Sequence, residues 1–115
     1  MKYGEADSYL VDENTKITDL SDAPESSNFD SVICEVDGYH PAESGGKKIF
    51  NSRNQKTYYI LEGNGEIHID GDKVQVQEGE FVNVPKQTPH SLEGSFRALI
   101  VTSPPFDPED EKLVE

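Results

Sequence analysis

Four of the ten lysine and arginine residues lie within ten positions, at Lys47, Lys48, Arg53 and Lys56. The whole chain has 23 acidic residues and a formal net charge of −13, so this segment reverses the local sign of the charge. Ammonium and guanidinium groups attract carboxylate and phosphate, which makes an anion-binding site one interpretation. The other interpretation is a solvated loop whose cations only balance nearby acidic residues.

Lys56 also opens a run of aromatic and aliphatic residues with high strand propensity. Side chains alternate between the two faces of a strand, so Lys56, Tyr58 and Ile60 share one face and Tyr59 lies on the other. A lysine and a tyrosine on one face, with His90 further along the chain, combine a cation with two hydrogen-bonding groups. Such residues suit the recognition of a small polar molecule, or proton transfer.

Short strand-forming segments recur about every ten residues, with turn residues between them. Residues 37–46 and 62–65 predict loops, and Asp70-Gly71 predicts a two-residue hairpin turn. The expected strands span residues 32–36, 58–61, 67–69, 74–77, 81–84, a short segment at Leu92, and 96–102, with edge strands near 9–11 and 16–17 and a further one from about 48. This spacing is typical of an antiparallel, all-β sandwich or barrel.

The length of 115 residues predicts one domain over 1–115, with an acidic arm at 1–30, a barrel at 31–103 and a tail at 104–115. Within the tail we expect a single helical turn or a frayed end. No apolar run is long enough to cross a membrane and no secretory signal opens the chain, so a cytoplasmic protein is expected. The negative charge argues against nucleic-acid and membrane partners. The single cysteine, Cys34, is expected to be a buried core residue.

Two segments resemble the signatures of small single-domain cupins of the RmlC-like superfamily. The first reads YYILEGNGEIHIDG (58–71) and the second reads GEFVNVPKQTPH (79–90), with Gln87 where the pattern usually has glycine. The resemblance covers about residues 31–106. It implies a jelly-roll β-barrel, or double-stranded β-helix, that is commonly a homodimer and holds a ligand inside the barrel mouth.

Metal-binding members of this family carry a His-x-His pair, a glutamate and a later histidine. The resemblance places the glutamate position on Lys56 and the pair on Ile49 and Asn51, or one residue later on Phe50 and Ser52. Residues 46–57 contain no His, Asp, Glu or Cys, so His90 alone remains of the four ligands. One imidazole does not hold a transition metal specifically. We therefore expect no metal and no cofactor. His68 is expected to face away from Ile67 and Ile69, out of the barrel.

In place of a metal, the family register predicts a pocket for a small polar or anionic ligand such as a carboxylate, a phosphate or a sugar. The predicted lining is Lys56, Tyr58, His90, Asn51, Arg53 and Asn83.

Three alternatives stay open. An isomerase, epimerase or lyase acting on a carbohydrate-like substrate would use His90, Tyr58 and Lys56 as acid and base groups. A divergent metal-dependent dioxygenase would recruit ligands such as His40 or Glu43. A structural dimer would fill the pocket with its own side chains.

Overall fold

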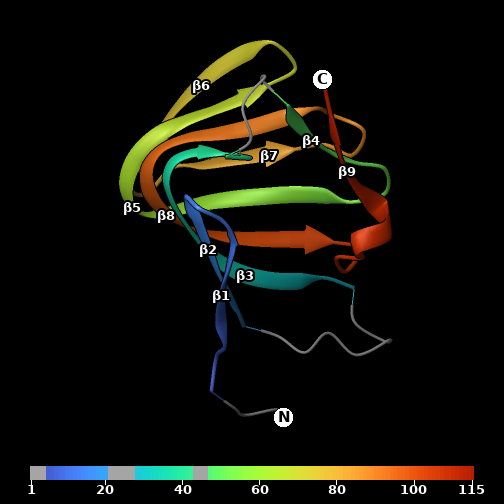
Figure 1. Cartoon of the computed structure of the whole chain (residues 1–115), viewed down its shortest axis with the longest axis horizontal. Coiled ribbons are helices and arrows are strands. Elements are labelled where there is room, and N and C mark those ends of the chain that lie inside the picture. The colour runs from blue at the N-terminus through green and yellow to red at the C-terminus, as the bar shows by residue number, and fades with distance from the viewer. Residues whose placement is uncertain (1–4, 21–27, 43–46) are drawn as a thin grey trace.

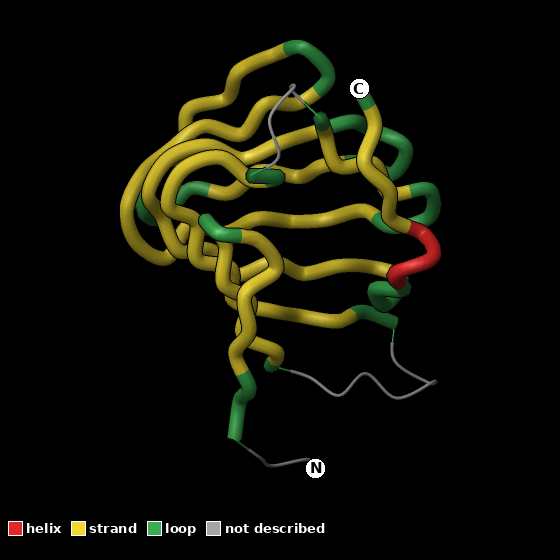
Figure 2. The backbone as a smooth tube through the Cα atoms, in the orientation of Figure 1, coloured by secondary structure: helices red, strands yellow, loops and turns green. Residues whose placement is uncertain are grey.

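The computed structural model describes residues 5–20, 28–42 and 47–115, and antiparallel strands dominate them (Figure 1). The strands are β1 (Ser8–Asp12), β2 (Thr15–Asp19), β3 (Asp30–His40), β4 (Lys48–Asn51), β5 (Gln55–Ile69), β6 (Asp72–Gln77), β7 (Phe81–Val84), β8 (His90–Ser103) and β9 (Glu111–Val114). One 3₁₀ turn, η1 (Pro108–Asp110), interrupts the strands near the C-terminus (Figure 2). Among the described residues, no helix is long and apolar enough to cross a membrane. The predicted all-β, antiparallel fold is confirmed.

The strands form one sheet that curls on itself. Its order is β1-β2-β3-β8-β4-β9, while β5 pairs with β8 and also with β6 and β7. The long strands β3, β5 and β8 bend round one side of the molecule, so each contributes to both layers of the barrel (Figure 1). The edge hairpin β1–β2 extends this sheet through the pairing of β2 with β3.

Three glycines lie side by side where the long strands bend. Gly94 of β8 pairs with Gly38 of β3 on one side and with Gly65 of β5 on the other. A Cβ atom on Gly94 would lie 2.6 Å from the Cα of Gly65, so only glycine allows this approach. Residues 37–40 and 62–65, which predicted loops, instead belong to β3 and β5, where Gly38 and Gly65 let the strands bend. For the same reason, Leu92 and residues 96–102 belong to one strand. Residues 43–46 of the first predicted loop lie outside the described residues.

β5 contains a bulge at Leu61. Ile60 pairs with Ala98 of β8 and Glu62 pairs with Arg97, so Leu61 is an additional residue between them. Before the bulge the even-numbered Tyr58 and Ile60 are buried. Beyond it the buried side chain is the odd-numbered Ile67, so the bulge exchanges the inner and outer faces of the strand.

Several local predictions are confirmed. Asp70 and Gly71 join β5 to β6 with φ values of 48° and 89°, the positive pair that a type I′ turn needs. β4, β7 and the N-terminal edge strands also form where expected. The frayed tail is wrong, because β9 pairs with β4 after the short helical turn.

The core lies between the two layers of the curled sheet. Its buried side chains are Cys34, Val36, Tyr58, Ile60, Ile67, Val76, Val84, Leu92, Phe96, Ala98 and Ile100. Cys34 is 1% exposed, and burial raises the pKa of its thiol to about 12. The thiol therefore stays protonated and unreactive at neutral pH, which confirms its predicted place in the core.

The close approach of the glycines predicts a large difference between two substitutions. Gly71→Ala meets open space, so it should cost only about 1–2 kcal/mol, the strain of a positive φ. Gly94→Ala, at φ 128°, should lose a further ~1–3 kcal/mol because the new methyl group overlaps Gly65. Urea denaturation of both variants measures these free energies of unfolding. Equal losses would show that β5 and β8 do not depend on this contact.

Candidate functional site

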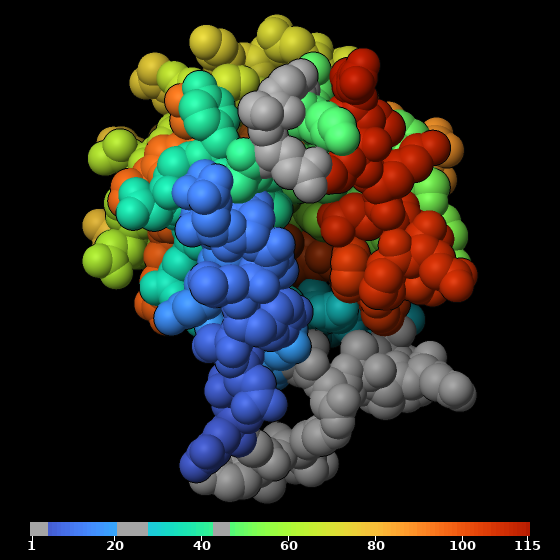
Figure 3. Space-filling view, viewed as in Figure 1, coloured from blue at the N-terminus to red at the C-terminus, as the bar shows by residue number. Residues whose placement is uncertain are grey.

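A cluster of polar side chains is buried inside the barrel. Asn51, Lys56, Tyr58 and His90 are between 1% and 9% exposed, and all four were predicted to line the pocket. β4, β5 and β8 supply them, and β9 adds a fifth residue, Glu111. Figure 3 shows a recess between the β1–β2 hairpin (blue) and the C-terminal segment (red).

His90 and Tyr58 form a hydrogen-bonded pair. The Tyr58 hydroxyl lies 3.0 Å from Nε2 of His90, and the two rings meet edge to face. Nδ1 of His90 lies 3.1 Å from the carbonyl oxygen of Thr88. A carbonyl can only accept, so Nδ1 carries a proton and donates it to Thr88. In a neutral imidazole, Nε2 is then the acceptor and the Tyr58 hydroxyl is the donor.

Lys56 and Glu111 form an ion pair beside them. Nζ of Lys56 lies 2.9 Å from Oε1 of Glu111, and Nδ2 of Asn51 donates to the same oxygen at 3.2 Å. The Lys56 ammonium also lies 5.9 Å from the centre of the Phe106 ring. The Lys56 side chain is 10% exposed and that of Glu111 is 29% exposed, so the cluster meets solvent mainly at Glu111.

Burial and charge shift the pKa values of these groups. Burial, followed by repulsion from Lys56, lowers the pKa of His90 from 6.5 to about 4. Burial acts to raise the pKa of Glu111, but attraction to Lys56 and hydrogen bonds from Lys56 and Asn51 outweigh it and lower the pKa. Burial raises the pKa of Tyr58. At neutral pH the cluster therefore holds a neutral imidazole, a protonated phenol and a Glu111 carboxylate that is paired with Lys56.

One acceptor in this cluster, Oδ1 of Asn51, has no hydrogen-bond partner within the part of the chain that the structure describes. The side-chain amide of Asn51 must point Nδ2 toward the Glu111 carboxylate, which fixes the position of Oδ1. Among the described residues, no group donates a hydrogen bond to this buried Oδ1. A bound hydroxyl or amide can supply that donor, since buried acceptors are normally paired.

The structure does not bring Arg53 and Asn83 to the cluster. The Arg53 side chain is 62% exposed and lies 3.8 Å from Asp110, a surface ion pair. Asn83 is exposed on the outer face of β7, where its Oδ1 accepts from Thr57 at 2.7 Å. Its neighbour Val84 is buried, so alternation along the strand places Asn83 on the opposite face.

The inner cluster does not fit a metal ion. Its only imidazole has both nitrogens engaged, and an ammonium occupies the position that the family gives to a glutamate ligand. A cation would be repelled by Lys56 and would compete with it for Glu111. Of the other proposed ligands, His40 is 2.6 Å from Asp12 in a separate contact, and Glu43 lies outside the described residues.

Sequence reasoning missed two acidic positions. Glu111 follows a proline-rich segment, and no local pattern signals its contact with Lys56, which lies 55 residues earlier in the chain. Glu93 lies opposite Glu66 on the outer face and joins His68, whose outward orientation was predicted correctly. The β5–β8 register is what brings Glu66, His68 and Glu93 together on the outer face, and the sequence alone does not specify it.

The low pKa of His90 predicts an acid-sensitive fold. Between about pH 7 and pH 5 the unfolded chain binds a proton at His90 that the folded chain does not. The free energy of unfolding therefore decreases as the pH is lowered. The expected contribution is about 2 kcal/mol, and His90→Gln should remove it. Urea denaturation of both proteins at the two pH values isolates this difference, since the other titrating groups are common to both. An identical pH dependence in the variant would contradict a neutral, buried His90.

Two comparisons concern sequence. A family model described as a cupin domain matches residues 37–102, which is more than half of the chain. An uncharacterized protein of Methanocaldococcus jannaschii is 33% identical over 66 residues, which are 54% of this chain and 53% of that protein. An uncharacterized protein of Aquifex aeolicus is 27% identical over 90% of this chain and 80% of its own length. The first match thus spans about half of that relative.

Solved structures share the fold. Pac13, described as a unique nucleoside dehydratase, superposes with a TM-score of 0.85 and 22% identity over 100% of this chain and 92% of its own. Variants of this Streptomyces protein have been solved with uridine. KdgF from a Halomonas species has a TM-score of 0.69 and 19% identity over 88% of each chain, and ectoine synthase from P. lautus has 0.70 and 16% over 92% and 80%. At these identities the likeness concerns the fold. With the family match and the curled antiparallel sheet, the chain belongs to the cupin family and folds as its jelly-roll barrel.

Proposed function

We propose that this protein binds a small, hydroxyl-rich molecule inside the barrel, over Asn51, Lys56, Tyr58, His90 and Glu111. The observation that carries the proposal is the buried Asn51 Oδ1, which no described residue satisfies. The other cluster contacts pair polar groups with one another, as a purely structural core would require. Asn51 departs from that pattern, because an unpaired buried acceptor costs free energy unless a ligand or water donates to it.

The charge of the cluster favours a neutral ligand over an anion. Lys56 was predicted to attract carboxylate or phosphate, but its ammonium is already paired with Glu111 at 2.9 Å. An anionic ligand would have to displace that carboxylate or lie against it. A sugar or nucleoside hydroxyl needs no such rearrangement, since it can donate to Asn51 and accept from Lys56.

The comparisons support a ligand of this kind. Variants of Pac13, which shares the fold at a TM-score of 0.85, have been solved with uridine. A cupin barrel of this size can therefore hold a nucleoside. The predicted cytoplasmic location and homodimer remain part of the proposal, as does the absence of a metal from the barrel interior.

Binding should depend on Asn51 and not on Asn83. We expect uridine or galactose to bind, and Asn51→Ala to weaken binding about tenfold, the equivalent of one buried hydrogen bond of ~1.4 kcal/mol. Asn83→Ala makes the same substitution on the outer face and should leave binding unchanged. Isothermal titration calorimetry with uridine, galactose and glucose 6-phosphate measures these affinities. Equal losses in both variants, or binding of glucose 6-phosphate alone, would contradict a neutral-ligand site at Asn51.

A second candidate function is proton transfer beside a substrate carbonyl, in an isomerase or a lyase. The hydrogen bond from Nδ1 to Thr88 favours it, because this bond leaves Nε2 of the neutral His90 as a base. If a substrate carbon replaces the Tyr58 hydroxyl beside Nε2, its proton passes to the imidazole. The enolate oxygen that forms is stabilised by the Lys56 ammonium. In an isomerase, Tyr58 donates its proton to the adjacent carbon while the substrate hydroxyl proton moves to the enolate oxygen. In a lyase, Tyr58 donates its proton to the departing hydroxide, which leaves as water. In both cases the imidazolium of His90 then returns a proton to the Tyr58 phenolate.

Exchange with solvent deuterium tests this second candidate. Proton NMR would follow loss of the C–H signal next to the carbonyl in a panel of aldoses, ketoses and uronic acids in D₂O. His90→Gln and Tyr58→Phe should each slow exchange by ~10²-fold or more. Arg53→Ala, which alters an exposed cation outside the cluster, should exchange at the normal rate. No exchange with any member of the panel, or exchange that survives His90→Gln, would leave binding as the function of the barrel.

A further inference from the structure

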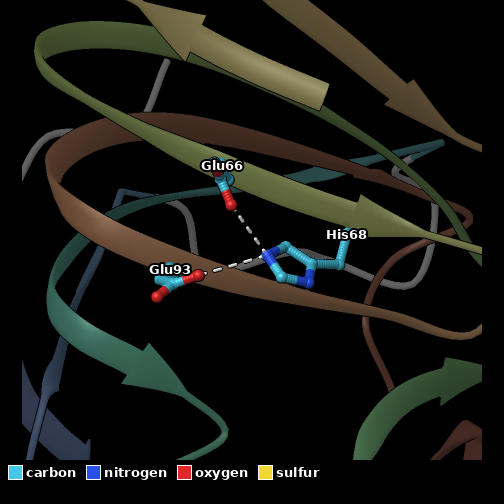
Figure 4. A group of neighbouring side chains, drawn as sticks. All are labelled: Glu66, His68 and Glu93. Carbon is cyan, nitrogen blue, oxygen red and sulfur yellow. Dashed lines mark hydrogen bonds and ion pairs between the residues drawn. The ribbon is translucent and has the colours of Figure 1, made fainter. Parts of the chain in front are cut away.

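A second cluster of ionisable side chains lies on the outer face of the barrel. Nε2 of His68 lies 3.2 Å from Oε2 of Glu66 and 3.3 Å from Oε1 of Glu93. Figure 4 shows the imidazole between the two carboxylates, with Glu66 and His68 projecting from β5 and Glu93 from β8. Among the described residues, this is the only group of three or more His, Cys, Asp or Glu whose ligand atoms all lie within 4.8 Å of one another.

The sheet register holds these groups together. Glu66 and His68 are two residues apart on one strand, so they share a face, and Glu93 is the direct partner of Glu66 across the β5–β8 ladder. Two carboxylates directly opposite each other repel, so the arrangement needs a positive charge between them. The adjoining pair, Gly65 and Gly94, brings the two strands into close contact, which fixes the spacing of this row.

The surroundings are also those of a ligand site. The three side chains are 22% to 32% exposed, so they are partly desolvated but reachable. The Tyr39 hydroxyl hydrogen-bonds to Glu93 from β3, as an outer partner does for a ligating carboxylate. Glu66 and Glu93 line one side of a groove of about 680 Å³, which Asn64, Gln75, Gln77 and Glu80 also border.

We propose that Glu66, His68 and Glu93 bind a divalent transition metal ion such as zinc on the outer face of the barrel. One imidazole nitrogen and two carboxylate oxygens are a ligand set that suits zinc, cobalt or manganese better than calcium or magnesium, because the hard cations prefer oxygen alone. Three protein ligands leave a further position for water or a small molecule from the groove. The sequence predicted no metal from the barrel interior, whereas this site uses the opposite face of the sheet.

Calorimetric titration of the EDTA-treated, dialysed full chain with Zn²⁺ alone tests the proposal. One ion should bind per chain, and His68→Gln and Glu93→Gln should each weaken binding by at least the ~10-fold that loss of an outer partner costs. Glu80→Gln is the matched control, since it removes the same charge from the same groove outside the cluster, and should retain the affinity within about twofold. Far-UV circular dichroism of the metal-free variants checks that each one folds.

A second readout identifies the ligands directly. The chain has three histidines, so a ¹H–¹⁵N spectrum of the imidazole groups should show Zn²⁺ shifting the His68 signals and sparing those of His40 and His90. Absence of stoichiometric binding would overturn the proposal, as would an equal loss in Glu80→Gln. Binding that survives His68→Gln but is lost in His90→Gln would also overturn it, and would place the metal inside the barrel.

Discussion

A buried ammonium group constrains the rest of this barrel. Lys56 lies on an inward-facing position of β5, where an unpaired charge would cost several kcal/mol. Glu111 supplies the counter-charge, and it does so only because β9 returns to pair with β4. The same ammonium contributes to the low pKa of His90, which keeps that imidazole neutral. Lys56 therefore links the position of the C-terminal strand to the protonation of His90, whose pKa burial lowers first and the ammonium lowers further.

The inner cluster could be predicted in large part from the sequence. Period-two alternation placed Lys56 and Tyr58 on one face, and the family register brought His90 to the same place, where its ring lies 3.0 Å from the Tyr58 hydroxyl. These contacts follow from strands with clear turn signals at their ends. The prediction that Asn83 lines the pocket is wrong for a reason that the sequence already contained. Asn83 alternates with Val82 and Val84, and Val84 is buried in the core, so Asn83 faces outward.

Other features depend on pairing between distant segments and could not be found locally. The segments that contain the paired glycines of β3, β5 and β8 have a composition typical of loops. Only the alignment of these glycines across the sheet shows that they allow strands to bend. Glu93 joins the outer cluster only because the β5–β8 register places it opposite Glu66. Tertiary contacts decide such cases, since a single segment specifies neither its partner strand nor its register.

The bulge at Leu61 has a consequence for how this chain can change over evolution. It lies between the inward-facing Lys56 and Tyr58 and the outward-facing Glu66 and His68, all of which β5 carries. Deleting that one residue would invert the second half of the strand, and an imidazole and a carboxylate would enter the barrel while Ile67 left it. The inner cluster and the outer Glu66–His68 group therefore stay on opposite faces of β5 because of the number of residues between them, which the bulge changes by one. A single-codon deletion is the shortest genetic step by which this surface could exchange with the interior.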